Sequence, residues 1–182
     1  MLEQKVSYRY ARALLDTASE VGIADTVFDD IKRVRATLNL SKDLRSMTAS
    51  PIFQLWKKKK IYKALFSEIK ISELTLNFLI LLLDKRRGEL IPSIVRQYEM
   101  QYNLLKNRLE VDVISAIELT EEIKKKVIDK LTIWTKMTIL PTYKIDTNIK
   151  GGLLVKIDDW VFDATIKRQL ETLFKKLTEG ID

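Results

Sequence analysis

The spacing of apolar residues changes close to Asn107 in this chain of 182 residues. Before that point, apolar residues recur at intervals of three and four positions, which is the pattern of amphipathic helices. From Leu109 to Glu118 the side chains alternate with the two-residue period of a strand. The change predicts a helical N-terminal domain, residues 1–105, followed by a second domain, residues 106–182, with a hinge near residues 104–109.

Six helices with short connections are predicted in the N-terminal domain, which makes this part an all-α bundle. Gly22 and Gly88 are expected to end helices, and Pro51 requires the third helix to stop before it. Asp25 is expected to cap the second helix. The six segments begin near Gln4, Asp25, Ser41, Trp56, Ser72 and Ile91.

The first and fifth helices carry more apolar surface than one buried face requires. On the first helix, one row contains Val6, Tyr10, Ala13, Leu14 and Thr17, and a second row of smaller residues contains Ala11, Leu15 and Ala18. The fifth helix is apolar almost all round from Leu74 to Leu83. Each surplus face either packs in the core, which is the usual outcome, or stays exposed and binds a partner. Two such helices in one small bundle make a groove for a guest amphipathic helix a reasonable alternative.

The second domain is predicted to be a small α+β domain, so the whole chain is expected to be mainly α. Thr120, Glu121 and Glu122 form a favourable helix start, because carboxylates there face the positive end of the helix dipole. Three strand-like runs follow at 139–145, 153–157 and 160–162, separated by Gly151-Gly152 and Asp158-Asp159. A last amphipathic helix from Thr165 carries Ile166, Leu170, Leu173, Phe174 and Leu177.

The composition removes most catalytic and metal-binding chemistry. The chain has no cysteine and no histidine, which excludes disulfides, thiolate or His-ligated metal sites, cysteine nucleophiles and a Ser-His-Asp triad. Gly151-Gly152 lacks the spacing of a phosphate-binding loop and precedes a strand, so it is interpreted as a turn with positive φ. Asp158, Asp159 and Asp163 could form a magnesium cluster, but a hairpin turn followed by a helix cap is the preferred interpretation. No catalytic residue, cofactor or metal is predicted, and an interaction protein is favoured over an enzyme.

The net charge of +7 is concentrated in residues 1–105, which carry 18 basic and 12 acidic residues. The Lys57–Lys60 and Lys85–Arg87 runs leave a basic helical nucleic-acid-binding module open as an alternative function. No aromatic interleaving or recognisable nucleic-acid motif accompanies them, so a solvated helical surface that faces an acidic protein partner is preferred. The most apolar run, residues 74–83, is about half the ~20 residues that a membrane-spanning helix needs.

Several stretches of the chain are similar to one known family. Residues 10–18, Tyr-Ala-Arg-Ala-Leu-Leu-Asp-Thr-Ala, resemble the first helix of ATP synthase delta subunits, called oligomycin-sensitivity-conferring protein in mitochondria. Residues 111–116 with Leu119-Thr120 are similar to the start of that family's C-terminal region. Four further stretches resemble the family signature and follow its order. They are Lys144-Ile145-Asp146, residues 149–157 with the Gly-Gly turn, residues 159–163 and residues 166–170.

The resemblance implies a non-catalytic subunit that links the catalytic head of a rotary ATP synthase to its peripheral stalk, on the nucleotide-facing side of the membrane. The family's N-terminal domain binds the N-terminal helix of an alpha subunit across the first and fifth helices. Carried over by position, that groove would consist of Tyr10, Ala13, Leu14, Thr17, Asn77, Phe78, Leu81 and Leu82. Phe28 would lie in the core or at the edge of the groove.

The resemblance also implies that the C-terminal domain binds the b subunits of the stalk. Gly151 and Gly152 would then determine the fold rather than contact a partner. The last helix would face the stalk through Leu170, Leu173, Phe174 and Leu177.

Overall fold

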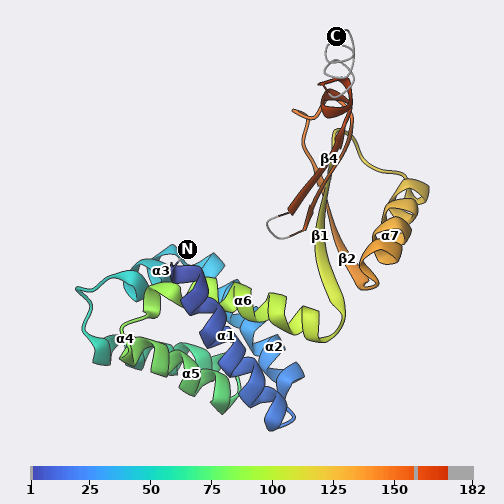
Figure 1. Cartoon of the computed structure of the whole chain (residues 1–182). Helices are drawn as coiled ribbons and strands as arrows, with labels where there is room; N and C mark the ends of the chain where they lie inside the picture. Colours follow the sequence, from blue (N-terminus) through green and yellow to red (C-terminus); the bar gives the residue numbers. More distant parts are fainter. Residues whose placement is uncertain (1, 158–159, 172–182) are drawn as a thin grey trace. The chain divides into compact units, whose positions relative to one another are not determined.

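The computed structural model describes residues 2–157 and 160–171, which are mainly helical with one four-stranded sheet (Figure 1). The chain divides into two compact units, Met1–Tyr102 and Asn103–Asp182. The prediction of a mainly helical chain that also contains a small α+β part is confirmed. Among the described residues, no helix is both long and apolar enough to span a membrane.

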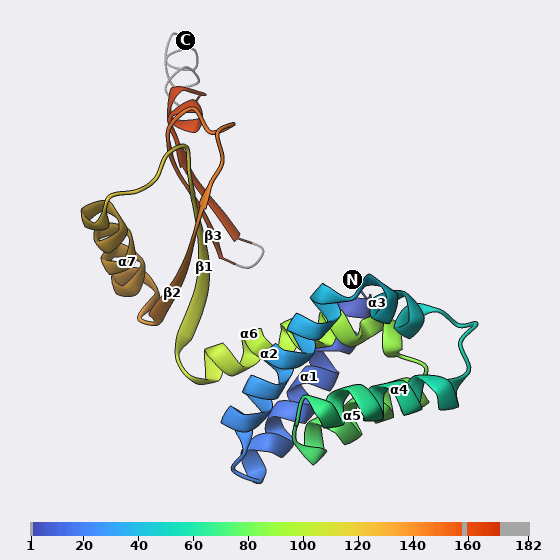
Figure 2. The ribbon, with the colours of Figure 1, turned by 180° about the vertical axis from the view of Figure 1, so that it is seen from behind.

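The first unit is built from helices joined by short connections. Its elements are α1 (Leu2–Glu20), α2 (Ala24–Leu40), α3 (Lys42–Ala49), α4 (Leu55–Glu68), α5 (Glu73–Asp84), the 3-10 turn η1 (Gly88–Leu90) and α6 (Ile91–Leu105), the last of which extends past Tyr102. α4 and α5 lie side by side in both views (Figure 1, Figure 2).

Serine side chains begin two of these helices, as the sequence predicts. The Ser41 Oγ accepts a hydrogen bond from the backbone N–H of Leu44 at 3.1 Å, and the Ser72 Oγ accepts one from Thr75 at 3.3 Å. The prediction that Asp25 caps α2 is wrong, because Ile23 occupies the N-cap position and makes no side-chain cap. Asp25 instead lies in the first turn, and its Oδ1 accepts a hydrogen bond from the Tyr102 hydroxyl at 2.5 Å.

The expectation that Gly88 ends the fifth helix is wrong. The helix already ends at Asp84, and Arg86 turns the chain with a left-handed φ of +55°. Gly88 begins η1, and a Cβ there would lie 2.8 Å from the carbonyl oxygen of Thr48 on α3. The glycine therefore permits close packing of two backbone segments rather than a helix stop.

The core of the first unit draws side chains from α1 to α6. Phe28 of α2 is buried and stacks on Tyr102 of α6, with ring centres 3.9 Å apart. The fully buried residues include Ala11 and Ala18 of α1, Ile31 and Val34 of α2, Tyr62 and Phe66 of α4, Leu82 of α5, and Ile91 and Tyr98 of α6. Because one continuous cluster contains all of them, the helices form a single folded body.

The second unit contains a mixed sheet with strand order β2-β1-β3-β4. Its elements are β1 (Arg108–Ser115), α7 (Glu121–Thr135), β2 (Thr138–Ile145), β3 (Gly152–Ile157) and β4 (Trp160–Thr165). β1 pairs parallel with β2 and antiparallel with β3, and β3 pairs antiparallel with β4. The α7 crossover between β1 and β2 is what a parallel pair requires.

α7 covers one face of this sheet (Figure 2). Val111 and Val113 of β1 point to that face and pack with Val127, Ile128 and Leu131 of α7. Alternation along β1 therefore places one row of apolar side chains under the helix, as the sequence predicts. The last predicted helix is helical over residues 166–171, whereas Leu173, Phe174 and Leu177, like Asp158 and Asp159, lie outside the described residues.

Candidate partner-binding surface on α1 and α5

The two apolar rows of α1 have different environments. Ala11, Leu15 and Ala18 are buried in the core, and so is Leu14 from the other row. The remaining positions of that other row keep access to the surface: Val6 and Tyr10 are half-buried, and Ala13 and Thr17 are exposed. α1 therefore packs through one face and leaves the row Tyr10, Ala13 and Thr17 at the surface.

α5 is divided in the same way. Phe78 and Leu82 are buried in the core, with Leu82 fully inaccessible. Asn77 is exposed, and Leu81 exposes 44% of its surface. Of the eight residues expected in the groove, Leu14, Phe78 and Leu82 thus belong to the core, whereas the other five have access to the surface.

The Tyr10 and Phe78 rings bring α1 and α5 together. Their ring centres lie 6.5 Å apart, with an edge-on angle of 61° between the planes. This arrangement is favourable for two aromatic rings, because the positive edge of one meets the negative face of the other. The contact puts the open row of α1 next to the helix that carries Leu81.

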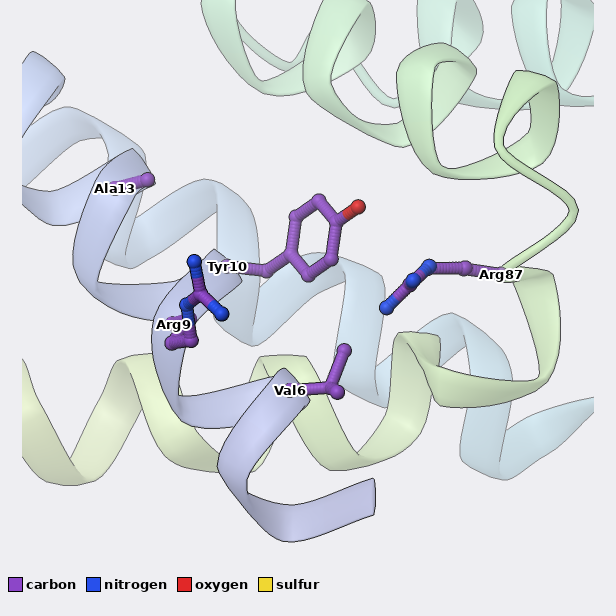
Figure 3. A pocket seen from close by; sticks show the side chains of 5 residues that line it. All are labelled: Val6, Arg9, Tyr10, Ala13 and Arg87. Carbon is purple, nitrogen blue, oxygen red and sulfur yellow. The ribbon is translucent and has the colours of Figure 1, made fainter. Parts of the chain in front are cut away.

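A pocket of about 340 Å³ opens beside Tyr10 (Figure 3). Val6, Arg9, Tyr10 and Ala13 of α1 line it, together with Arg87 from the segment after α5. The Arg87 side chain points toward Tyr10, and its guanidinium carbon lies 5.4 Å from the centre of the Tyr10 ring (Figure 3). The pocket therefore has apolar walls and two guanidinium groups.

The sequence does not assign Arg9 and Arg87 to the site. Arg87 belongs to a run of three basic residues that looks like a solvated surface, and only the chain reversal after α5 directs it toward Tyr10. Arg9 precedes Tyr10 and lies outside the apolar rows of α1. Its spacing of four positions from Ala13, a predicted groove residue, is a signal that the sequence does contain.

The Lys57–Lys60 run is partly used inside the first unit. The buried Lys58 Nζ donates hydrogen bonds to the carbonyl oxygens of Thr48 at 2.8 Å and Ser50 at 2.6 Å. Burial lowers the pKa of this amino group. Lys59 forms an ion pair with Asp84 of α5. Two of the four lysines therefore have hydrogen-bond or ion-pair partners inside the unit, which reduces what the run offers to a nucleic-acid backbone.

The strongly perturbed tyrosines of the first unit lie in the core, away from the pocket. Burial raises the pKa of Tyr62 to about 12, and burial also raises the pKa of Tyr98. Among the residues that the structure describes, no three His, Cys, Asp or Glu side chains come together as a metal site. The pocket and the open rows of α1 and α5 thus offer apolar contact and positive charge, which suit the binding of a protein segment.

In the second unit, Gly151 and Gly152 form a turn with φ of +149° and +84°. A Cβ on Gly152 would lie 2.4 Å from the carbonyl oxygen of Ala164, so the close pairing with β4 requires glycine. Asp163 accepts a hydrogen bond from the backbone N–H of Thr165 at 2.9 Å, and its hydrogen bonds with Thr165 lower its pKa. Leu170, one of the four stalk candidates, is 60% exposed.

Comparison with known proteins points to one family. The sequence model of the ATP synthase delta (OSCP) subunit matches residues 6–177. Proteins named ATP synthase subunit delta are similar over nearly their whole length. The one from Desulforamulus reducens is 31% identical over 97% of both chains, and the one from Chlorobium phaeobacteroides is 34% identical over 95% of this chain and 96% of the relative.

A solved structure shares the fold. A chain of the Toxoplasma gondii mitochondrial ATP synthase hexamer superposes with a TM-score of 0.79 at 19% identity, covering 94% of this chain and 97% of that one. At this identity the likeness concerns the fold alone. The family match over nearly the whole chain and the relatives above 30% identity carry the assignment. The chain therefore belongs to the ATP synthase delta (OSCP) subunit family.

Proposed function

We propose that this chain is a non-catalytic stator subunit of an F-type ATP synthase, which ties the catalytic head to the peripheral stalk so that proton flow is coupled to ATP synthesis. The observation that carries the proposal is the pair of open helix faces on α1 and α5, joined at Tyr10 and Phe78 beside a pocket. Family membership supplies the complex in which these faces would have a partner.

Helices α1–α6 would act as one six-helix domain, residues 1–105, that binds the N-terminal helix of an alpha subunit. Tyr10, Ala13 and Thr17 would contact the guest helix from one side, and Asn77 and Leu81 from the other. The buried Leu14, Phe78 and Leu82 would hold these helices in place from below. Apolar anchors of this kind give most of the affinity when a helix binds in a groove.

Residues 106–182 would form the domain that binds the b subunits. The exposed Leu170 would contribute to this contact, with Leu173, Phe174 and Leu177 after it in the sequence. The subunit would be attached to the nucleotide-facing side of the membrane only through its complex. Because torque on the rotor acts on the head, both contacts must hold while the rotor turns.

The head contact is tested by calorimetric titration with a synthetic peptide of the cognate alpha subunit's N-terminal segment. One-to-one binding is expected with the wild-type protein and should be lost in Leu81→Asp. Leu40→Asp is the matched control, because Leu40 is 89% exposed on α2 and should bind like wild type. Failure of the folded wild-type protein to bind the peptide would contradict the proposal.

The stalk contact is tested with the purified soluble part of the b subunits. Removal of residues 172–182 is expected to abolish binding to b while peptide binding remains unchanged. Unchanged b binding by the truncated protein would assign the stalk contact to another surface.

A further inference from the structure

We propose that the groove selects an acidic guest helix, with one carboxylate of the guest bound in the pocket beside Tyr10 that Arg9 and Arg87 line. The inference rests on the proposed function and adds the chemistry by which the partner is recognised. It follows from the two positive charges that line the pocket beside Tyr10. These charges are not part of the apolar pattern of α1 and α5.

The geometry of Arg87 prepares it for a carboxylate. Its guanidinium carbon lies 5.4 Å from the Tyr10 ring centre, and its side chain is half-buried. A guanidinium held near the face of an aromatic ring by a cation-π contact keeps its N–H groups available, because that contact uses none of them as hydrogen-bond donors. Those donors match the two oxygens of a carboxylate, so Arg87 can bind one while it keeps its contact with Tyr10.

Within the part of the chain that the structure describes, neither Arg9 nor Arg87 has an ion pair with an acidic side chain. Arg12, one turn along α1, differs in this respect: its Nε lies 2.9 Å from the Asp16 carboxylate. Arg9 and Arg87 line the same pocket, and Figure 3 shows the Tyr10 ring between them. A neutral guest helix would cover two like charges and leave them unpaired, which is costly, whereas a carboxylate would neutralise them.

The pocket also fixes where the acid must lie on the guest. Val6, Tyr10 and Ala13 repeat at helical spacing along one row of α1, so an apolar anchor of the guest packs on them. The acidic residue then lies three or four positions from that anchor on the same side of the guest helix. The partner is therefore an amphipathic helix with an Asp or Glu one turn away from an apolar anchor.

The test is a set of double-mutant cycles with the alpha-subunit peptide. Arg87→Gln and Arg9→Gln are each titrated with the peptide and with versions in which one Asp or Glu at a time is changed to Asn or Gln. Each arginine substitution is expected to weaken binding of the original peptide about tenfold. One of the acid-to-amide peptides should bind the wild-type protein as weakly as the original peptide binds Arg87→Gln. The affinity of that peptide should not fall further when the protein carries Arg87→Gln. Arg12→Gln is the matched control and should change affinity less than about twofold.

Additive losses for every acid-to-amide peptide, or wild-type affinity in both Arg9→Gln and Arg87→Gln, would overturn the inference. Arg87→Lys keeps the charge but not the planar donor geometry, so it should bind between wild type and Arg87→Gln. Peptide binding that is lost in Leu81→Asp but unaffected by both glutamine variants would overturn this inference and leave the proposed function standing. No binding to the folded wild-type protein would overturn both.

Discussion

The Asp30 carboxylate of α2 accepts a hydrogen bond from the backbone N–H of Ser72, the N-cap residue of α5, with 2.8 Å between nitrogen and oxygen. The same oxygen accepts a second hydrogen bond from the Thr75 hydroxyl at 3.1 Å. Asp30 is 2% exposed, so its carboxylate is largely shielded from water. The carboxylate fixes the start of α5, and therefore the position of the helix that presents Leu81.

Asp30→Ala is expected to lower the free energy of unfolding by about 2–3 kcal/mol, because two donors lose a buried charged acceptor. Asp29→Ala is the matched control: Asp29 is exposed and should change stability by less than about 0.5 kcal/mol. Urea denaturation followed by circular dichroism measures both. Equal stabilities for the two variants would show that the α5 start does not depend on this carboxylate.

Lys58 is expected to be the one lysine of its run that stabilises the fold by donating hydrogen bonds to two backbone carbonyl oxygens. Lys58→Met should cost about 1–3 kcal/mol, because the carbonyls of Thr48 and Ser50 lose their donor. Lys60→Met, two residues away and exposed, should be nearly neutral. Chemical denaturation of the two variants provides the comparison, and a neutral Lys58→Met would mean that water replaces the amino group without cost.

Tyr62 is expected to make stability depend on alkaline pH. Burial raises its pKa from 10.0 in the unfolded chain to about 12, so its contribution is complete below pH 10 and is lost as the pH rises through 12. The loss between these values is about 1.4 kcal/mol per pH unit. At pH 8, Tyr62→Phe should be less stable than wild type by about 1 kcal/mol, since the phenol loses its 2.8 Å hydrogen bond with Thr48.

At pH 11 the two proteins should be about equally stable, or Tyr62→Phe should be the more stable one. The reason is that only wild type must keep the Tyr62 proton on folding. Urea denaturation at pH 8 and pH 11 measures the two differences. Tyr98, whose pKa burial also raises, is present in both proteins and cancels from the comparison. A difference that stays constant with pH would contradict the assignment to Tyr62.

Gly152→Ala is expected to destabilise the second unit more than Gly22→Ala destabilises the first. Both glycines have a positive φ, +84° and +76°, so both variants carry a backbone strain of about 1 kcal/mol. Only at Gly152 would the new Cβ meet another atom, the Ala164 carbonyl oxygen at 2.4 Å, whereas nothing lies within 4 Å at Gly22. Hydrogen exchange measures the stability of each unit separately. Equal losses of stability in the two variants would show that the β3–β4 pair shifts to accommodate the new Cβ.

The elements of this fold follow from local patterns, whereas the candidate site follows from them only in part. The helices and strands appear in the apolar periods, and Ser41 and Ser72 begin their helices through contacts with residues close in sequence. Asp25 does not cap α2, because the helix begins one residue before it, and its carboxylate instead accepts a hydrogen bond from Tyr102, a residue far along the chain. Arg87 joins the pocket only because the chain reverses after α5, and Lys58 differs from its neighbouring lysines only through the position of the α3 end. Such contacts depend on packing, which a single sequence does not display.

The arrangement of β1 has a mechanical consequence. β1 follows α6 directly in the chain and pairs in parallel with β2 along its whole length, from Arg108 opposite Thr138 to Ser115 opposite Ile145. A tensile load that enters the second unit at Arg108 along the strand axis shears this ladder, so its hydrogen bonds share the force and do not break one after another. β4, which lies at the edge of the sheet and pairs only with β3 among the described strands, can be peeled away from its end. The unit should therefore withstand pulling through its N-terminal strand better than pulling through β4.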